Sequence, residues 1–257
     1  MVERTKTYFV SDVHLGSAFC DSMRLEKDFV DFLDGISSDA RALYLLGDIF
    51  DFWYEYRYVI PRGHTRTLGK LAELCDSGVE VCFFPGNHDV WAYGYFEKEI
   101  GMKVLSQPYV MEAAGCRFCL GHGDGLGKTD AGFRFIRWMF HNRFLQRLFS
   151  AVHPRWAFAL GYAWAAHSKK MKMAPDNAAF SFKGEDEPVF RFADDFGRNW
   201  AAVHGGGIDY YIFGHLHTPA RTRIPSGGEL IILGDWSHGG EYAVYDGCSL
   251  SLVRRYF

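Results

Sequence analysis

The stretch ALYLLGDIFD, residues 42–51, decides the fold, because an apolar run stops abruptly at a glycine and two carboxylates. A short apolar run of this kind is typical of a strand buried inside a sheet. The glycine permits a tight turn, and polar residues directly after a buried strand lie where α/β sheets place their functional sites. We therefore expect a sheet whose strand ends carry the chemistry, and the same arrangement recurs along the chain.

Strands and helices are predicted to alternate through the first hundred residues. Apolar runs predict buried strands at Tyr8–Val10, Ala42–Leu46 and Val79–Phe84, each followed by a polar loop. Apolar residues at helical spacing predict helices at Ser22–Leu33 and His64–Cys75. A β-α-β-α-β order of this kind indicates an α/β sheet with helices packed against it.

The second half of the chain contains more hairpin signals. We expect two strands within residues 103–120 and further strands at 210–213, 221–233 and 241–256, with glycine-containing turns between them. Residues 185–204 have a helical pattern that stops at three consecutive glycines. Together with the first half, these elements predict an α/β (α+β) protein in which two mixed sheets pack together with helices on the outside.

Residues 131–175 differ in composition from the rest of the chain. They contain eight basic residues and no acidic residue, which leaves 20 basic and 31 acidic residues elsewhere. They are also rich in aromatic side chains, among them Phe133, Trp138 and Trp156. We interpret this segment as a helical cap inserted into a single domain that spans residues 1–257. Its aromatic residues could line an acyl groove, and its basic residues could bind a diphosphate or anionic head groups.

Length and composition agree with one enzyme-sized domain. The chain has 257 residues, 48% of them hydrophobic, and can bury a sizeable core. Its six cysteines include one C-x-x-C pair, Cys116 and Cys119, but no second pair of the kind that a structural zinc site needs. The first residues have no signal-peptide core, and no run of about 18 apolar residues occurs. We therefore expect a cytoplasmic protein with reduced thiols.

Five short motifs supply candidate metal ligands, and each follows an apolar run. They combine carboxylates, an amide and imidazoles, a mixture that suits Mn, Fe, Co or Zn. Seven candidate ligands are too many for one ion with an open position, but they suit two ions that share a carboxylate. The motifs are Asp12-Val13-His14, Gly47-Asp48-Ile49-Phe50-Asp51, Gly86-Asn87-His88-Asp89, Gly121-His122-Gly123-Asp124 and Gly214-His215-Leu216-His217.

In their order, these motifs resemble those of the calcineurin-like metallophosphoesterases, and the match extends from Asp12 to His217. The resemblance implies a four-layer sandwich with two divalent ions, manganese (Mn2+) being the first choice. It also implies a role for each matching residue. Asp12, His14 and His217 would hold one ion; Asn87, His122 and His215 would hold the other; Asp48 would bridge both; His88 would face the substrate phosphate; Asp51 and Asp89 would orient the ligands or His88.

The mechanism implied by this resemblance follows from charge. Two cations lower the pKa of a bridging water, and the resulting hydroxide attacks phosphorus in line. His88 would stabilise the developing charge or protonate the leaving oxygen. Asp48 and His88 are therefore the catalytic candidates. We expect His88→Ala to keep both metals and to lose most of kcat.

A closer resemblance, over nearly the whole chain, is to the UDP-2,3-diacylglucosamine pyrophosphatases of lipid A biosynthesis. It rests on LLGDIFDFW (45–53), HGDGL (122–126), HSK (167–169) and LGDW (233–236). That family cleaves UDP-2,3-diacylglucosamine to UMP and 2,3-diacylglucosamine 1-phosphate, and a helical cap holds the acyl chains. The resemblance implies a lipid-linked UDP-sugar substrate and a peripheral position on the cytoplasmic face of the inner membrane. The candidate substrate contacts are Asp130, Ser168 and Lys169.

One residue departs from the pattern and keeps the choice of substrate open. The best-known branch of the pyrophosphatase family has arginine at the position of His88. The alternative function is a soluble phosphodiesterase or phosphatase acting on nucleotides or phosphoproteins. A third is a non-catalytic metal-binding scaffold, although all seven candidate ligands are present. No nucleic-acid partner is expected, because the basic surface is confined to one aromatic-rich insertion, and nothing in the sequence specifies an oligomeric state.

Overall fold

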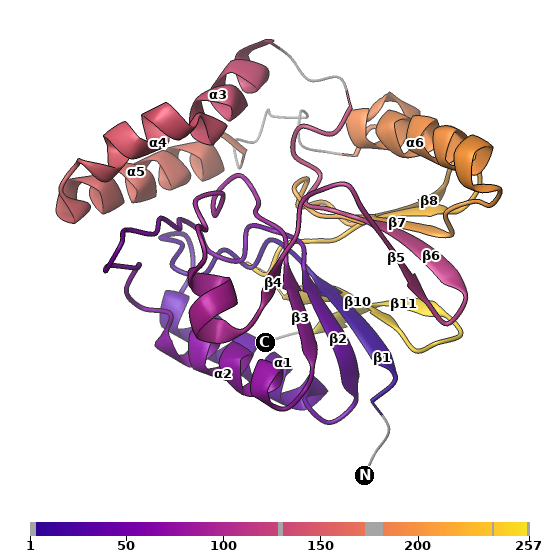
Figure 1. Ribbon diagram of the computed structural model, residues 1–257, viewed down its shortest axis with the longest axis horizontal. Coiled ribbons are helices and arrows are strands. Elements are labelled where there is room, and N and C mark those ends of the chain that lie inside the picture. The colour runs from indigo at the N-terminus through magenta and orange to yellow at the C-terminus, as the bar shows by residue number, and fades with distance from the viewer. Residues whose placement is uncertain (1–3, 128–130, 173–181, 238, 256–257) are drawn as a thin grey trace.

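Two mixed β-sheets form the centre of the protein (Figure 1). The structure is a computed structural model that describes residues 4–127, 131–172, 182–237 and 239–255. The first sheet has the strand order β11-β10-β1-β2-β3-β4. Its strands are β1 (Lys6–Val10), β2 (Ala40–Leu45), β3 (Glu80–Phe83), β4 (Lys103–Val104), β10 (Gly240–Tyr245) and β11 (Leu250–Arg255).

The second sheet has the strand order β5-β6-β7-β9-β8. Both sheets contain parallel and antiparallel pairs, as predicted: β1 is parallel to β2 but antiparallel to β10, and β7 is parallel to β6 and β9 while β8 is antiparallel to β9. The strands of the second sheet are β5 (Tyr109–Ala113), β6 (Cys116–Leu120), β7 (Tyr210–Phe213), β8 (Ala220–Arg223) and β9 (Glu229–Ile232).

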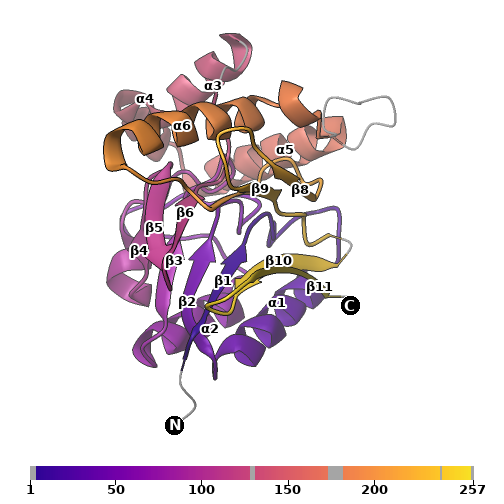
Figure 2. The same cartoon turned by 90° about the vertical axis from the view of Figure 1, so that its right-hand side faces the viewer.

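Helices cover the outer faces of both sheets (Figures 1 and 2), which confirms the predicted four layers. Phe29 and Phe32 from the helix after β1 pack against Trp236 beneath the first sheet. Val189 and Phe190 of the last helix pack against the second sheet. The helices are α1 (Ser22–Ile36), α2 (Thr65–Asp76) and the one-turn π-helix η1 (Phe96–Ile100) on the first sheet, and the short 3₁₀ helix η3 (Gly184–Asp186) and α6 (Pro188–His204) on the second.

The two sheets pack together through a layer of aromatic rings. Phe9 of β1 stacks on Tyr44 of β2 and on Phe118 of β6, with ring centroids 5.6 Å apart in both pairs. Burial of each large apolar side chain contributes about 1.5–3 kcal/mol. This layer fixes the two sheets relative to each other, so that the loops at the carboxyl ends of their parallel strands meet.

Two predicted elements differ in detail. Residues 103–120 form three strands instead of two, because the chain first adds β4 to the edge of the first sheet and then crosses to β5 and β6 of the second. The helix expected at 185–204 is divided into η3 and α6. Pro188 causes this division, because proline has no N–H to donate and favours the first helical position, with an extended Glu187 before it.

Three further helices lie above the carboxyl ends of the strands (Figure 1). They are α3 (Ala131–His141), α4 (Arg143–Ser150) and α5 (Pro154–Lys172), and we call them the cap helices. Asn142 ends the first and begins the second, because its side chain accepts hydrogen bonds from the N–H groups of Phe144 and Leu145. Within the described parts of the chain, none of the helices has the length and apolar character needed to cross a membrane.

Candidate metal centre

The predicted ligands come from five loops at one edge of the two sheets. Each loop follows the carboxyl end of a parallel strand: β1, β2 and β3 in the first sheet, and β6 and β7 in the second. In the order of these strands, the loops carry Asp12 and His14; Asp48 and Asp51; Asn87, His88 and Asp89; His122; and His215 and His217.

The backbone at this edge adopts conformations that non-glycine residues rarely take. Five of the seven candidate ligands have left-handed φ angles, and among the described residues Ala114 is the one other non-glycine residue that does. Each such conformation costs on the order of 1–3 kcal/mol and persists where the surroundings impose it, commonly at functional sites. The five are Asp12 (φ 53°), His14 (53°), Asp48 (51°), His215 (71°) and His217 (58°).

One group of side chains converges around His14. Its Nε2 lies 3.4 Å from Nε2 of His217, 4.0 Å from Oδ1 of Asp12 and 4.0 Å from Oδ2 of Asp48. These four residues can bring one ligand atom each within 4.8 Å of one another. Asp12, His14 and Asp48 are almost completely buried. Three of these residues are those predicted for the first ion, and Asp48 is the predicted bridge.

A second group converges around Asn87. Its Oδ1 lies 3.3 Å from Nε2 of His122 and 3.0 Å from Nδ1 of His215. The same Nε2 of His122 lies 3.4 Å from Oδ2 of Asp48. Asp48 therefore lies between the two groups, which together contain the seven predicted ligands.

A hydrogen bond and a close carboxylate contact orient two of the imidazole rings towards the centre of each group. Nδ1 of His122 lies 2.9 Å from the carbonyl oxygen of Leu46, so this nitrogen donates its proton outwards. Nδ1 of His14 lies 3.2 Å from Oδ1 of Asp51, which is one of the two supporting aspartates predicted. A histidine held in this way turns its other nitrogen to a metal ion and becomes a better ligand.

The other supporting aspartate, Asp89, holds the backbone of two loops together. Its buried carboxylate accepts hydrogen bonds from the N–H groups of Gly86 (2.7 Å) and of Asp48, Ile49 and Phe50 (3.2, 2.8 and 3.3 Å). The loops after β2 and β3 are joined through this one side chain. Asp89 therefore fixes the position of Asp48 without entering either group of ligands.

His88 lies beside the ligands and contacts two of the other motifs. Its Nδ1 lies 2.8 Å from the carbonyl oxygen of Asp51, and its backbone N–H donates to Oδ1 of Asp48 at 2.8 Å. Its ring meets that of His14 edge to face, with centroids 4.9 Å apart. The contact with the carbonyl commits Nδ1, so Nε2 is the nitrogen left for a substrate.

Burial and charge shift the pKa values in the centre. Burial by itself raises the pKa of Asp48, but the charges of His122, His88 and His14 outweigh it and hold the pKa well below its usual range. Burial lowers the pKa of His122, whereas the charge of Asp48 raises it, with a net result of about 10. Asp48 is thus held in its charged carboxylate form by the cationic groups around it.

The donor set fits divalent metal ions. Carboxylate, amide and imidazole atoms bring their lone pairs together at 3.0–3.4 Å, and without a cation or a shared proton they would repel one another. Imidazole binds metals in its neutral form, so a cation next to Asp48 would replace the proton of His122. The geometry is therefore that of a cation site with hard and borderline ligands.

Two supporting side chains were not assigned from the sequence. Asp235, in the loop after β9, lies with Oδ2 3.4 Å from Nδ1 of His217 and orients that ring as Asp51 orients His14. Gln107 holds the loop of His122 through a bond from Gly123 N–H to its Oε1 (2.8 Å). The apolar-Gly-Asp pattern at 233–235 repeats that at 46–48 and could have indicated Asp235, whereas no pattern marks Gln107.

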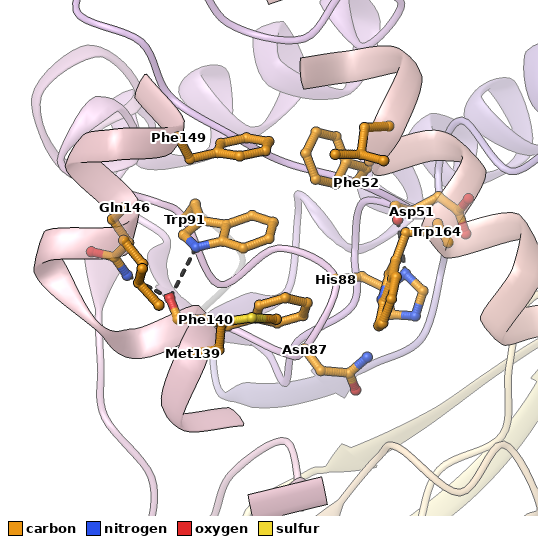
Figure 3. Close-up of a pocket in the computed structure, with 14 residues that line it drawn as sticks. Asp51, Phe52, Asn87, His88, Trp91, Met139, Phe140, Gln146, Phe149 and Trp164 are labelled. Atoms are coloured by element: carbon orange, nitrogen blue, oxygen red, sulfur yellow. Dashed lines mark hydrogen bonds between the residues drawn. The ribbon is translucent and has the colours of Figure 1, made fainter. Parts of the chain in front are cut away.

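A cavity of about 400 Å³ lies between the centre and the cap helices (Figure 3). Asn87, His88 and Asp51 form its floor, and Gln146 is its other polar lining residue. The remaining walls are almost entirely apolar. They consist of Phe52, Trp91, Met139, Phe140, Leu145, Phe149, Leu160, Gly161, Trp164 and Ala165. We call this space the apolar cavity.

The predicted substrate contacts are only partly described. Asp130 and the side chain of Lys169 lie outside the described residues. Ser168 is half-buried in α5 and is not among the residues that line the apolar cavity. These three residues stay predictions.

Comparisons with known proteins agree with this geometry. A family model described as calcineurin-like phosphoesterase matches residues 5–219. A protein named UDP-2,3-diacylglucosamine hydrolase from Porphyromonas gingivalis is 40% identical over 259 residues, with 97% of each chain covered. A protein of the same name from Ralstonia nicotianae is 32% identical, covering 89% of this chain and 83% of that protein. The predicted resemblance is confirmed: the chain belongs to the calcineurin-like phosphoesterase family.

Proposed function

We propose that this protein hydrolyses UDP-2,3-diacylglucosamine to UMP and 2,3-diacylglucosamine 1-phosphate. The observation that carries the proposal is the apolar cavity, which opens directly on Asn87 and His88 of the candidate centre. A diphosphate substrate with two acyl chains needs such a cavity beside the reacting phosphorus, whereas a water-soluble nucleotide or a phosphoprotein does not. Relatives that carry this hydrolase name match nearly the whole chain.

The walls of the apolar cavity favour chains over flat polar groups. Trp91 lies edge to face with Phe140 and nearly parallel to Phe149, at centroid distances of 4.9 and 5.9 Å. Gly161 of α5 allows Phe52 to pack against the helix, because a Cβ at this position would overlap the Phe52 ring. The cavity is therefore shaped by ring packing, as expected for a site that excludes water from acyl chains.

We propose that Asp12, His14 and His217 hold one divalent ion, that Asn87, His122 and His215 hold the second, and that Asp48 bridges them. Manganese is the first choice, and Fe, Co and Zn fit the same ligands. When bound, the two ions supply a hydroxide nucleophile and neutralise the phosphoryl oxygens. The protein's own contribution is to orient these ligands through Asp51, Asp89 and Asp235.

His88 is the proposed catalytic residue outside the ligand set. The Asp51 carbonyl accepts a hydrogen bond from Nδ1 and so fixes the ring, and the imidazolium form of His88, which carries a proton on both nitrogens, would donate from Nε2 to a phosphoryl or leaving oxygen. Asp48 accepts its backbone N–H and keeps the residue next to the ligands. His88 therefore donates a hydrogen bond to the substrate in the transition state without binding the ions.

We further propose that residues 1–257 form one catalytic domain, with the cap inserted at 131–175. We also propose that this domain contacts the cytoplasmic face of the inner membrane as a peripheral protein. Aromatic and aliphatic side chains of the cap helices are strongly exposed, among them Phe144 (73%), Trp156 (66%) and Phe135 (62%). The same segment carries eight basic residues and no acidic residue. Apolar side chains with surrounding positive charge favour the surface of an anionic bilayer.

The decisive assay measures UMP released from UDP-2,3-diacylglucosamine by the protein in the presence of Mn2+, with an aryl phosphodiester in parallel. UMP release at a catalytic rate is the expected result. Rapid aryl phosphodiester hydrolysis without UMP release would refute the lipid substrate and favour the soluble phosphodiesterase.

A pair of glycine variants tests the apolar cavity itself. Gly161→Ala displaces Phe52, whereas Gly69→Ala in α2 is the matched control, because nothing lies within 4 Å of its Cβ position. We expect Gly161→Ala to lower kcat/KM for the lipid substrate about tenfold more than for the aryl phosphodiester, as misplaced binding groups cost rates of this order. Equal losses on both substrates would contradict a role of the cavity in holding acyl chains.

A further inference from the structure

A second cavity, of about 220 Å³, lies beside His215. It is formed by the loop after β6, the first turn of α3, the start of α6 and the loop after β7. Its lining includes the aromatic ring of Phe133 and the carboxylate of Glu187. We call this space the His215 cavity.

The two cavities flank the same candidate centre. Asn87 lines the apolar cavity and His215 lines the His215 cavity, and their Oδ1 and Nδ1 atoms are 3.0 Å apart. Helix α3 lies between the cavities, since Phe133 from its first turn faces one and Phe140 from its last turn faces the other. A molecule whose middle lies on the centre can therefore extend one half into each cavity.

The walls of the His215 cavity differ from those of the apolar cavity because they contain a carboxylate. Glu187 is only 7% exposed, although it precedes α6 and makes no capping hydrogen bond with its side chain. Its Oε2 accepts a long bond, 3.4 Å, from the N–H of Lys183, and Oε1 has no hydrogen-bond partner among the described residues. A carboxylate buried to this degree is unfavourable unless hydrogen-bond donors satisfy it.

The rest of the cavity offers flat and apolar surfaces. The ring of Phe133 lies 6.3 Å from that of His215, centroid to centroid. Leu126 and Val189 add aliphatic surface, and the backbone of Gly123 and Gly125 is exposed to the cavity. Aromatic faces bind nucleobases by stacking, and neighbouring backbone groups can bond to the base edge.

We propose that the His215 cavity binds the nucleoside half of the substrate, with the ribose hydroxyls donating to Glu187 and the base packing on Phe133. The inference rests on the proposed function, and it adds a subsite for the nucleoside, to which the proposed function assigns no residues. A carboxylate that accepts ribose hydroxyls is a general way to hold a nucleotide. The negative charge of Glu187 also repels a phosphate, so the uncharged nucleoside lies in the cavity and the phosphate on the cationic centre.

Binding of UMP to the Mn2+-loaded protein tests this subsite, with calorimetry as the measurement. Glu187→Gln removes the charge, and Glu185→Gln, an exposed position two residues earlier, is the matched control. We expect UMP affinity to fall about tenfold in the first variant and to stay unchanged in the second. The unmodified protein should also prefer UMP to 2′-deoxy-UMP, and Glu187→Gln should lose that preference.

A second variant keeps the test independent of whether Glu187→Gln folds. Phe133→Leu removes the aromatic face and retains an apolar side chain. Its affinity for UMP should fall about tenfold while binding of inorganic phosphate is retained, because base stacking contributes and the cationic centre is not altered. UMP affinity equal to that of the unmodified protein in both variants overturns the inference.

The outcomes separate the subsite from the proposed function. If the unmodified protein releases UMP from UDP-2,3-diacylglucosamine but neither variant weakens UMP binding, the function holds and the nucleoside subsite is refuted. If no UMP is released but UMP binds in a manner that depends on Glu187 and Phe133, the subsite holds and the lipid half of the proposed substrate is refuted.

Discussion

The loops of the candidate metal centre and the cap helices above them are built in opposite ways. Asp12, Asp48 and His122 are completely buried, and the backbone of five ligands is held in left-handed conformations. By contrast, α3 and α4 contain no buried residue among those described, and several of their aromatic side chains face outwards. A buried, strained site is over-determined by its surroundings, whereas an exposed helical layer can shift at small cost.

Hydrogen bonds, an ion pair and several ring contacts join these two regions. The hydroxyl of Tyr54 donates to the carbonyl of Gln146 at 3.0 Å, and Nε1 of Trp91 donates to the carbonyl of Phe140 at 3.1 Å. Arg137 of α3 forms an ion pair with Asp124, in the loop that carries His122. Each contact runs from a loop of the centre to a cap helix.

This contrast indicates that the centre and the cap have different roles. We propose that the centre carries out the reaction on any phosphoester that reaches it, and that the cap selects which phosphoesters reach it. Changes in the loops should therefore reduce activity on every substrate. Changes in the cap or its contacts should reduce activity on the lipid substrate more than on a small aryl phosphodiester.

The largest effect is expected for Asp48→Asn. The substitution keeps the shape of the side chain but removes its negative charge, which lies next to His122 and would lie next to both proposed ions. Turnover of both substrates should fall on the order of 10³-fold, as for the loss of a central electrostatic group. Steady-state kinetics and metal analysis measure it, with the exposed Asp76→Asn as the control. A loss of activity confined to the lipid substrate would contradict the proposal that the centre acts on every substrate and the cap selects among them.

His88→Ala should have the next largest effect. The protein is expected to retain two metal ions while kcat falls about 10²-fold on both substrates, because the substitution removes a proton donor but no metal ligand. Metal analysis of the purified variant and kinetics with both substrates provide the measurement. If the variant loses an ion, His88 belongs among the ligands and the assignment is wrong.

Much of the centre could be predicted because its signal is local. An apolar strand that stops at Gly-Asp or at Gly-Asn-His-Asp is visible in a few consecutive residues, and the parallel order of the strands brings those ends together. The four layers followed from the same strands and from helical periodicity. The resemblance then supplied the grouping of ligands, which stays a prediction; the structure brings the side chains around His14 and Asn87 close together.

The features that were missed depend on packing between distant segments. Asp235 reaches His217 only because β7 and β9 are neighbours in the second sheet, and Gln107 reaches Gly123 from the crossing between the sheets. Strand β4 is two residues long, too short to show an alternating pattern. Tyr54 and Trp91 donate hydrogen bonds to backbone carbonyls of the cap, and no sequence pattern predicts such a contact.

An intermediate effect is expected for Asp235→Ala. The ring of His217 loses the carboxylate that orients it, so the affinity for one of the two metal ions should fall about 10- to 100-fold. Metal titration followed by activity measures this change, and excess metal should restore the rate on both substrates. The exposed Asp195→Ala in α6 is the control. A loss that metal cannot restore would show that Asp235 acts on something other than the ligand.

The smallest effect is expected for Tyr54→Phe, which removes the hydroxyl that bonds the centre to the cap. The ring keeps its edge-to-face contact with Phe149, so the substitution removes only the polar contacts of the hydroxyl, among them the bond to the Gln146 carbonyl, at a cost of about 1 kcal/mol. KM for the lipid substrate should rise several-fold, and trypsin should cleave faster after the arginines of α3 and α4.

The control for this variant is Tyr58→Phe, because Tyr58 is 83% exposed. An equal rise of KM for the aryl phosphodiester would mean that Tyr54 supports the centre itself, and the cap could not then be treated as a separate determinant. A rise for the lipid substrate alone, together with faster cleavage of the cap, would show that the position of the cap is set by its contacts with the loops. A weak contact such as this one would then be selective, because its loss would change which substrate is accepted without changing how phosphorus is attacked.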